Sequence, residues 1–370
     1  MNGLPTPKSL PPKTDEIEVS IFGPGFGESL VVHLGNNEWL IVDSCRDLGG
    51  GGENLPVQYL ESMGVDLATA VKLVVLTHWH DDHIRGVGEV LTKCGTAKVA
   101  MTSALSSENF RSALAPWLAQ NTAIKETTGL TELRELGPRL TQLRPIYASH
   151  NKVLFEGALP FQREVRALSP SDASVAVSIA ELANIPKEQR IGRIPRIHGN
   201  HTSVVLSIKI ANRRLLLGAD LESRASADHG WLAVVEHHLA AGHPPYEIWK
   251  ASHHGSANGD HPRIWAEMLT EDPHVLLAPF VNGGVKLPVE ADVSRILSKT
   301  SKAWITAPPD SSKLKLGNKL VEKQMISMAK TVRTVPRSFG HVRLRSMIAQ
   351  DSGEWDVEVA GDAVALQELE

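Results

Sequence analysis

Alternating and continuous apolar runs predict several β-strands in the first part of the chain. Residues 17–22 alternate apolar and polar side chains, which predicts a half-buried strand, and residues 30–34 and 39–42 predict two more. The Asn36-Asn37 pair between the last two runs is typical of a hairpin. The glycines of the preceding FGPGFGES stretch lead into a strand rather than a helix, so this stretch does not fit a dinucleotide-binding loop.

Helix-like and strand-like patterns alternate through the rest of the chain. Further strands are predicted at 71–76, 98–101, 152–155, 202–210, 214–217, 246–250, 275–278 and 303–306, and helices at 55–70, 86–91, 172–182, 226–241 and 290–299. Residues 340–347 and 355–359 predict a closing hairpin. This alternation indicates a layered α/β protein.

The pattern is least regular between about 105 and 198, where seven prolines interrupt it. Short helices are predicted there at 109–118 and 131–136, and the whole region is interpreted as a lid-like or substrate-shaping insertion. Residues 1–16 are rich in proline and predict a flexible lead-in. We therefore expect one domain over 17–350 that contains the insertion, followed by a closing strand and tail over 351–370.

Composition narrows the class of protein. Apolar residues make up 42% of the 370 residues and charged residues 22%, as expected for a globular chain. Its two cysteines are too few for a disulfide framework, which favours a reducing compartment. No apolar run is long enough to span a membrane. The sequence predicts a cytoplasmic protein without a membrane partner and leaves its oligomeric state open.

Charge is unevenly distributed. The whole chain has a net charge of −4, but residues 313–345 carry nine basic residues and one acidic residue, Glu322. That segment is therefore +8 and leaves −12 for the rest of the chain (−4 minus 8). Such a basic strip is either a surface for a polyanion or an ordinary solvated face.

The strongest chemical signal follows the apolar run at 71–76. His78, His80, Asp82 and His83 come within six positions after this run, in the stretch THWHDDH. Imidazole and carboxylate groups are ligands for divalent transition metals, with Zn–N bonds of ~2.0–2.1 Å. His78 and His80 are two residues apart, so in an extended segment they point the same way, while Asp82 and His83 lie beyond the turn. A second ion is therefore within their reach.

Two later strand ends carry the same kinds of side chain. Asp220 follows the strand at 214–217, and His253 and His254 follow the strand at 246–250. A carboxylate from another strand suits a bridging position between two ions about 3.5–4 Å apart, which stabilise attacking and leaving oxygens. The other histidines have no such neighbours: His229, His237 and His238 lie on a predicted helix and are expected to face solvent.

This ordered set of residues resembles the metallo-β-lactamase superfamily. The matching features are Asp43 after the early hairpin, the 78–83 stretch, Asp220 and His253. Within the superfamily, GPGFGESLVV…WLIVDS, NHTSVVL…LLLGAD and KASHHGS are similar to the hydrolase domain of bacterial competence-type DNA-uptake channel proteins. The resemblance implies a four-layer αββα sandwich with the site at one edge of the sheets.

The resemblance also implies a role for each matched residue. His78 and His80 bind a first metal ion, Asp82, His83 and His253 bind a second, and Asp220 bridges the two. Asp43 is expected to orient a ligand from outside the ligand set. His254 and Ser256 are expected where a substrate oxyanion or leaving group is contacted.

Two departures from the family pattern leave alternatives open. Many members have a further histidine on the first metal ion, whereas the competence-type relatives tend to have asparagine there. In this chain Asn200 and His201 are adjacent, and we expect His201 to be the ligand, with His198 as the alternative. The sequence Gly218-Ala219-Asp220 also has an extra alanine where Gly-Asp is common, which affects the geometry of the bridging carboxylate.

The predicted activity is hydrolysis by a metal-bound hydroxide. Two divalent ions, zinc or alternatively manganese, lower the pKa of bound water towards ~7. Asp82 is expected to accept the proton of the nucleophile, and His254 or a bound water to protonate the leaving group. The preferred substrate is a phosphodiester, including nucleic acid. The alternatives are a small-molecule hydrolase of a lactone, thioester or other ester, and a binding or regulatory protein without catalysis.

Overall fold

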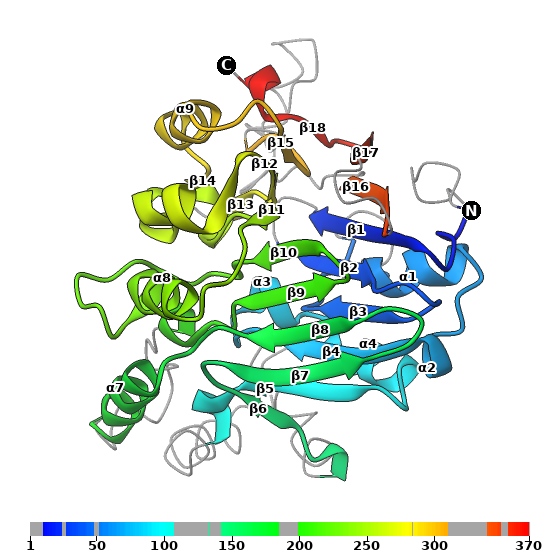
Figure 1. Ribbon diagram of the computed structural model, residues 1–370, viewed down its shortest axis with the longest axis horizontal. Helices are drawn as coiled ribbons and strands as arrows, with labels where there is room; N and C mark the ends of the chain where they lie inside the picture. The colour runs from blue at the N-terminus through cyan, green and yellow to red at the C-terminus, as the bar shows by residue number, and fades with distance from the viewer. Residues whose placement is uncertain are drawn as a thin grey trace, which may run out of the picture.

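The computed structural model describes residues 10–23, 27–47, 52–106, 132, 142–184, 199–282, 284–309, 339–348 and 354–369. Two eight-stranded sheets pack face to face in the middle of the molecule, and helices lie on their outer faces (Figure 1). The apolar residues form three clusters: one between the sheets and one under each helical layer. The predicted four-layer αββα arrangement is therefore confirmed.

The first sheet has the strand order β17-β16-β1-β2-β3-β4-β5-β6. Its strands are β1 (Glu16–Gly23), β2 (Ser29–His33), β3 (Trp39–Val42), β4 (Val71–Leu76), β5 (Lys98–Thr102), β6 (Ile146–Ala148), β16 (Gly340–Met347) and β17 (Asp356–Ala360). β3, β4, β5 and β6 run parallel to one another, whereas the other neighbours are antiparallel. The predicted closing hairpin is present as β16 and β17, and β16 pairs with β1 along its full length.

The second sheet has the order β18-β15-β12-β11-β10-β9-β8-β7. Its strands are β7 (Lys152–Gly157), β8 (Arg163–Ala167), β9 (Leu206–Ile210), β10 (Arg213–Leu217), β11 (Tyr246–Lys250), β12 (Leu269–Leu277), β15 (Ala303–Ile305) and β18 (Val364–Ala365). β10, β11, β12 and β15 are parallel. A separate small hairpin consists of β13 (Phe280–Asn282) and β14 (Val285–Leu287).

Helices cover the outer face of each sheet. The α-helices are α1 (Leu55–Ser62), α2 (Leu67–Ala70), α3 (Asp81–Ile84), α4 (Val87–Lys93), α7 (Asp172–Ala183), α8 (Gly230–Ala240) and α9 (Glu290–Leu297). Short 3₁₀ or π turns occur at η1 (Ser103–Ser106), η3 (Gly199–Thr202), η4 (His253–Gly255), η5 (Ala257–Gly259), η6 (Ile264–Met268) and η7 (Leu366–Leu369). Side chains of α1, α2 and α4 pack on the first sheet, and those of α8, α9 and η6 pack on the second.

The first strand differs from its prediction because both of its faces are covered. Every residue of β1 after Glu16 is buried, so the strand is not half-exposed. Ile17, Val19 and Ile21 point between the sheets. On the other face, buried Glu18 accepts hydrogen bonds from Ser20 Oγ (2.8 Å) and Tyr59 Oη (2.7 Å). Because buried Glu18 and Ser20 are hydrogen-bonded, apolar and polar residues alternate in the sequence although both faces of the strand are buried.

Two predicted helices and one histidine predicted to face solvent differ from the structure. The helix predicted at 55–70 is interrupted into α1 and α2, and the one predicted at 226–241 begins at Gly230. His238 on α8 is buried rather than facing solvent. The helices predicted at 109–118 and 131–136 lie outside the described residues, apart from Glu132. Among the helices that are described, none has the length and apolar character required to cross a membrane.

Candidate metal centre

The ends of four parallel strands place the candidate ligands at one edge of the sheets. β3 is followed by Asp43, and its parallel neighbour β4 is followed by the 78–83 stretch. In the second sheet, β10 is followed by Asp220 and its parallel neighbour β11 by η4. Because the carboxyl ends of parallel strands meet at the same edge, residues far apart in the sequence converge here.

Four buried side chains form the centre of the site. Asp82, His83, Asp220 and His254 each present one ligand-type atom, and these atoms all lie within 4.8 Å of one another. His254 Nε2 lies 3.2 Å from Asp82 Oδ2 and 3.4 Å from Asp220 Oδ2. His83 Nε2 lies 3.4 Å from Asp220 Oδ1. Ligands around a tetrahedral ion with bonds of 2.0–2.1 Å are about 3.3 Å apart, so this spacing suits a single divalent ion.

His78 and His80 extend the group on one side. His78 Nε2 lies 3.9 Å from Asp220 Oδ2, and the His78 ring is 4.7 Å from the His80 ring between centroids. Asp220 therefore directs Oδ1 towards His83 and Oδ2 towards both His78 and His254. The Asp220 carboxylate thus faces three histidines with its two oxygens.

Buried nitrogen and oxygen atoms without partners indicate residues suited to bind a cation. Nε2 of His78, Nε2 of His83 and Oδ1 of Asp220 are all buried, and none has a hydrogen-bond partner among the described residues. Leaving buried polar atoms unsatisfied is costly, and in native proteins such atoms usually have partners. Neutral imidazole nitrogens and carboxylate oxygens are the donors that zinc and manganese accept. The residues present therefore fit a divalent metal ion.

The pKa values of the histidines in the cluster are shifted in opposite directions. Burial, together with the neighbouring His83 and His80 rings, holds the pKa of His78 well below its ordinary value, so His78 is neutral. Burial also lowers the pKa of His254, but the carboxylates of Asp220 and Asp82 outweigh it and raise that pKa to about 10. The same carboxylates raise the pKa of His83 well above its ordinary value, again against burial. Without metal, protons on His83 and His254 balance the aspartates.

Asp43 holds His83 from the side away from the cluster. His83 Nδ1 donates to Asp43 Oδ2 at 2.8 Å, which leaves Nε2 facing Asp220. Thr77 contributes its backbone N–H (2.8 Å) and its hydroxyl (2.6 Å) to the same carboxylate. Asp43 thus fixes the tautomer and ring orientation of His83 without entering the ligand group, which is the position expected from the sequence.

The two adjacent histidines of η4 point in different directions. His254 donates from Nδ1 to the carbonyl of Ala278 (3.1 Å) and turns Nε2 into the cluster. His253 contacts Asn258 Oδ1 through Nδ1 (2.8 Å), and its Nε2 lies 3.2 Å from the Asn200 amide. Both residues have left-handed backbones, with φ of 49° and 57°. His254, rather than His253, thus lies in the cluster, while the roles of both histidines stay predictions.

His201 and Asn200 lie beside this centre on η3. Asn200 Nδ2 donates to Glu222 Oε1 (3.0 Å), and His201 Nε2 lies 3.4 Å from Glu222 Oε2. The His201 ring also contacts the Arg224 guanidinium. His80 lies against Gly199, where an added Cβ would be 2.9 Å from His80 Nε2. The role of His201 as a ligand to the first ion stays a prediction, and His198, the alternative, lies outside the described residues.

Sequence reasoning missed a buried ion pair behind the cluster. Lys250, the last residue of β11, forms an ion pair with Glu28 and donates to the carbonyl of Ala219 at 3.0 Å. Glu28 Oε2 lies 3.6 Å from His254 Nδ1, and Glu28 Oε1 lies 3.8 Å from His83 Nδ1. The available signal was only the charged residue itself: Glu28 just before the apolar run of residues 30–32, and Lys250 at the end of the strand YEIWK.

Comparison with known proteins places this site in a family. The sequence model of the metallo-beta-lactamase superfamily matches residues 22–264, which include every ligand candidate in the cluster. The chain belongs to the metallo-β-lactamase superfamily. Members of this superfamily are in general metal-dependent hydrolases. No curated protein sequence matches the chain.

Solved structures of the same superfamily are similar at low sequence identity. One is the metallo-beta-lactamase fold protein YhfI from Bacillus subtilis, at 13% identity and a TM-score of 0.38, covering 79% of this chain and 95% of that one. Another is MEM-A1, a subclass B3 metallo-beta-lactamase from a soil metagenome library, at 13% identity and a TM-score of 0.33, covering 67% and 81%. BJP-1 of Bradyrhizobium japonicum, also subclass B3, has 12% identity and a TM-score of 0.29, covering 60% and 70%.

Proposed function

We propose that this protein is a binuclear metal-dependent hydrolase that cleaves a phosphodiester bond. The observation that carries the proposal is the buried cluster of Asp82, His83, Asp220 and His254, with its ligand atoms within 4.8 Å of one another. The KASHHGS box and the NHTSVVL…LLLGAD hairpin further support a relationship to the hydrolase domain of competence-type DNA-uptake proteins. A phosphodiesterase or nuclease activity follows from that relationship.

The proposed ligands divide between two ions. His78 and His80, with His201 as the predicted third histidine, would hold the first ion. Asp82, His83 and His254 would hold the second, and Asp220 would bridge. His254 takes the place proposed from sequence for His253 because its Nε2, rather than that of His253, lies beside Asp82 and Asp220. Two divalent ions, zinc or manganese, would supply Lewis acidity and a lowered pKa for bound water.

Side chains of the protein would orient the metal ligands and transfer protons. Asp82 lies 3.2 Å from His254 and at the centre of the cluster, where its carboxylate is suited to accept the proton of an attacking water. Asp43 and Thr77 hold His83 in one tautomer. His253, which is 20% exposed, is the histidine beside the cluster from which a leaving group would receive a proton.

A phosphodiester is favoured by cationic and hydrogen-donating side chains on one flank of the site. His201 and His253 each lie near Glu222, and Arg224 contacts the His201 ring. The basic strip at 313–345 adds little to this argument. Its residues from Lys313 to Arg337 lie outside the described residues, and Arg343 and Arg345 are paired with Glu358 and Glu18.

The proposal is tested by metal analysis combined with parallel assays. The purified protein is expected to contain about two equivalents of zinc or manganese per chain. It is expected to hydrolyse bis-p-nitrophenyl phosphate, and DNA and RNA are assayed beside it. A simple lactone and a thioester are assayed in the same preparation, because preferential cleavage of either would favour the alternative hydrolase class.

Variants separate the cluster from contaminating activity. His80→Ala and Asp82→Ala are expected to abolish phosphodiester hydrolysis while the protein stays folded by circular dichroism. Activity that survives both substitutions and prolonged treatment with a chelator would contradict the proposal. A protein that binds metal but cleaves none of the substrates would support the non-catalytic alternative.

A further inference from the structure

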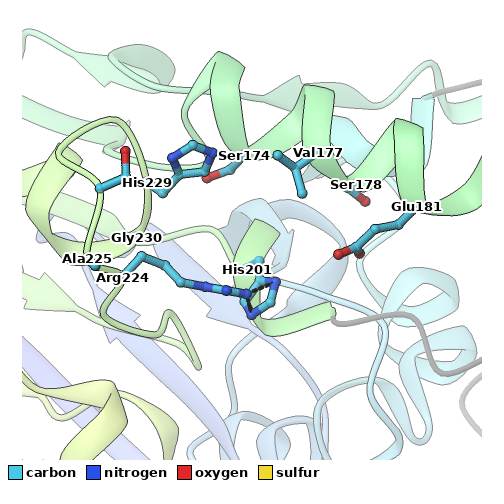
Figure 2. A pocket seen from close by; sticks show the side chains of 10 residues that line it. Ser174, Val177, Ser178, Glu181, His201, Arg224, Ala225, His229 and Gly230 are labelled. Carbon is cyan, nitrogen blue, oxygen red and sulfur yellow. Dashed lines mark hydrogen bonds between the residues drawn. The ribbon is translucent and has the colours of Figure 1, made fainter.

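A cavity of about 270 Å³ opens beside the metal centre. Helix α7 forms one wall, and η3 together with the loop from Arg224 to Gly230 forms the other. Figure 2 shows Val177, Ser178 and Glu181 directed from α7 towards the cavity, with His201 and Arg224 opposite them. The cavity thus lies between the second sheet's loop after β10 and a helix of the predicted 105–198 insertion.

The residues that line the cavity lie close to residues of the candidate metal centre, either along the chain or through hydrogen bonds. Arg224 is four residues after Asp220 on the same loop. His201 is two residues after Gly199, which lies against His80. Between them, Glu222 accepts a hydrogen bond from Asn200 and lies near His253. A molecule held with one end at the cluster would therefore extend into this cavity.

Two buried polar atoms of the cavity wall lack partners among the described residues. Ser178 Oγ and His229 Nδ1 are buried, and neither forms a hydrogen bond within the part of the chain that the structure describes. Ser178 is only 3% exposed, yet it lines the cavity. A buried hydroxyl and a buried ring nitrogen without partners are costly unless a ligand or water satisfies them. They point to a polar group bound in the cavity.

The charges in the wall define which polar group fits. Arg224 Nη2 contacts the nitrogens of the His201 ring, and the planar guanidinium donors match a carboxylate. Glu181 lies on the α7 side of the same cavity and would repel a dianion or a second negative group. Val177, 43% exposed, supplies an apolar surface beside these groups. The combination suits one monoanionic group on an apolar carrier and disfavours a nucleic-acid backbone.

We propose that this cavity is a substrate subsite for a carboxylate attached to an apolar or aromatic group, with Arg224 as its anchor. The proposal rests on the proposed hydrolase function and narrows its substrate to a small phosphodiester that carries a carboxylate. A nucleic-acid chain, with one charge on every phosphate, is then not the preferred substrate.

The test compares two aryl phosphodiesters in the metal-loaded enzyme: 4-nitrophenyl phenyl phosphate and 4-nitrophenyl 4-carboxyphenyl phosphate. The wild type is expected to prefer the carboxylate substrate by about tenfold in kcat/KM, the value of one charge-assisted contact. Arg224→Gln is expected to reduce that ratio to near one. Arg166→Gln, in which the arginine is bound by Glu164 on β8, is the matched control and is expected to keep the preference.

Binding of benzoate, measured by titration calorimetry, separates the subsite from catalysis. Benzoate is expected to bind the wild type and Arg166→Gln and to bind Arg224→Gln at least tenfold more weakly. If neither diester is cleaved but this pattern of binding holds, the proposed function fails and the subsite stands. A wild type without the substrate preference, or equal benzoate binding by Arg224→Gln, would overturn the subsite.

Discussion

The ammonium group of Lys250 forms an ion pair with the carboxylate of Glu28 in the interior of the protein, where neither side chain is more than 1% exposed. Lys250 Nζ also lies 3.8 Å from Asp220 Oδ1, and the backbone N–H of Glu28 donates to the carbonyl of Asp82 at 2.9 Å. The pair thus joins the segments that carry Asp82, Asp220 and His254. It connects the two sheets directly behind the candidate metal ligands.

Lys250→Met is expected to destabilise the metal-free protein by about 3–5 kcal/mol, because it leaves the Glu28 carboxylate buried without its partner. Urea unfolding in the presence of a chelator measures this change. Glu28→Gln combined with Lys250→Met is expected to be less destabilising than Lys250→Met alone, since no unpaired charge remains.

The exposed pair of Lys93 and Glu61 provides the control for that experiment. Their side chains are 49% and 46% exposed and the pair is screened by solvent, so Lys93→Met is expected to change stability much less than Lys250→Met. Equal stability of Lys250→Met and Lys93→Met would show that the buried pair does not hold the segments together.

Asp43→Asn is expected to weaken metal binding by about 10–100-fold while leaving the number of ligands unchanged. The amide cannot accept from both His83 and Thr77 as the carboxylate does, so the His83 ring loses its fixed orientation. Competition with a chromophoric chelator measures the affinity. Asp272→Asn, at the distant contact with Thr300 and Lys302, is the control and should retain wild-type affinity.

His254→Ala and His253→Ala are expected to differ in metal content, although the residues are neighbours. His254→Ala should lose about one equivalent of metal per chain, because its Nε2 lies among the ligands of the second ion. His253→Ala should retain both equivalents, since the His253 ring contacts Asn258 and Asn200. Elemental analysis by mass spectrometry distinguishes the two outcomes, and the reverse pattern would restore the assignment expected from sequence.

His341→Phe is expected to make the metal-free protein less sensitive to acid. His341 is buried on β16, stacked 4.5 Å from Phe22, and burial with Arg343 and Arg345 lowers its pKa to about 3. The unfolded chain takes up a proton at pH ~6.5, which the folded chain does not, so stability is present above this pH and lost as the pH falls. The loss from this histidine between pH 8 and pH 5 is about 2 kcal/mol.

Unfolding of the wild type and His341→Phe by urea at pH 8 and pH 5 measures this difference. The variant should lose about 2 kcal/mol less than the wild type over that range, because phenylalanine can keep the stacking without a titrating ring. An identical pH dependence in the two proteins would contradict the assignment of this loss to His341.

The sequence by itself was sufficient for the fold class and for the main ligand-bearing stretch. A buried strand at Val71–Leu76 followed by His78, His80, Asp82 and His83 is a local pattern, since the ligand types and their spacing lie within one strand and one turn. Asp43 directly follows one apolar strand and Asp220 lies three residues after another, and the family resemblance implied their roles. Strand periodicity and strand ends are local properties, and they remain visible in a single sequence.

Only the tertiary structure decided which atoms of these segments meet. The left-handed backbone at His253 and His254 determines which of the two rings enters the cluster, and that depends on contacts with Ala278 and Asn258. Glu28 lies just before β2 of the first sheet and Lys250 ends β11 of the second, and their pairing has no local signature in either segment. The cavity between α7 and Arg224 likewise joins residues about fifty positions apart. These contacts are determined by packing between segments that are far apart in the sequence. The periodicity of a single strand carries no information about that packing.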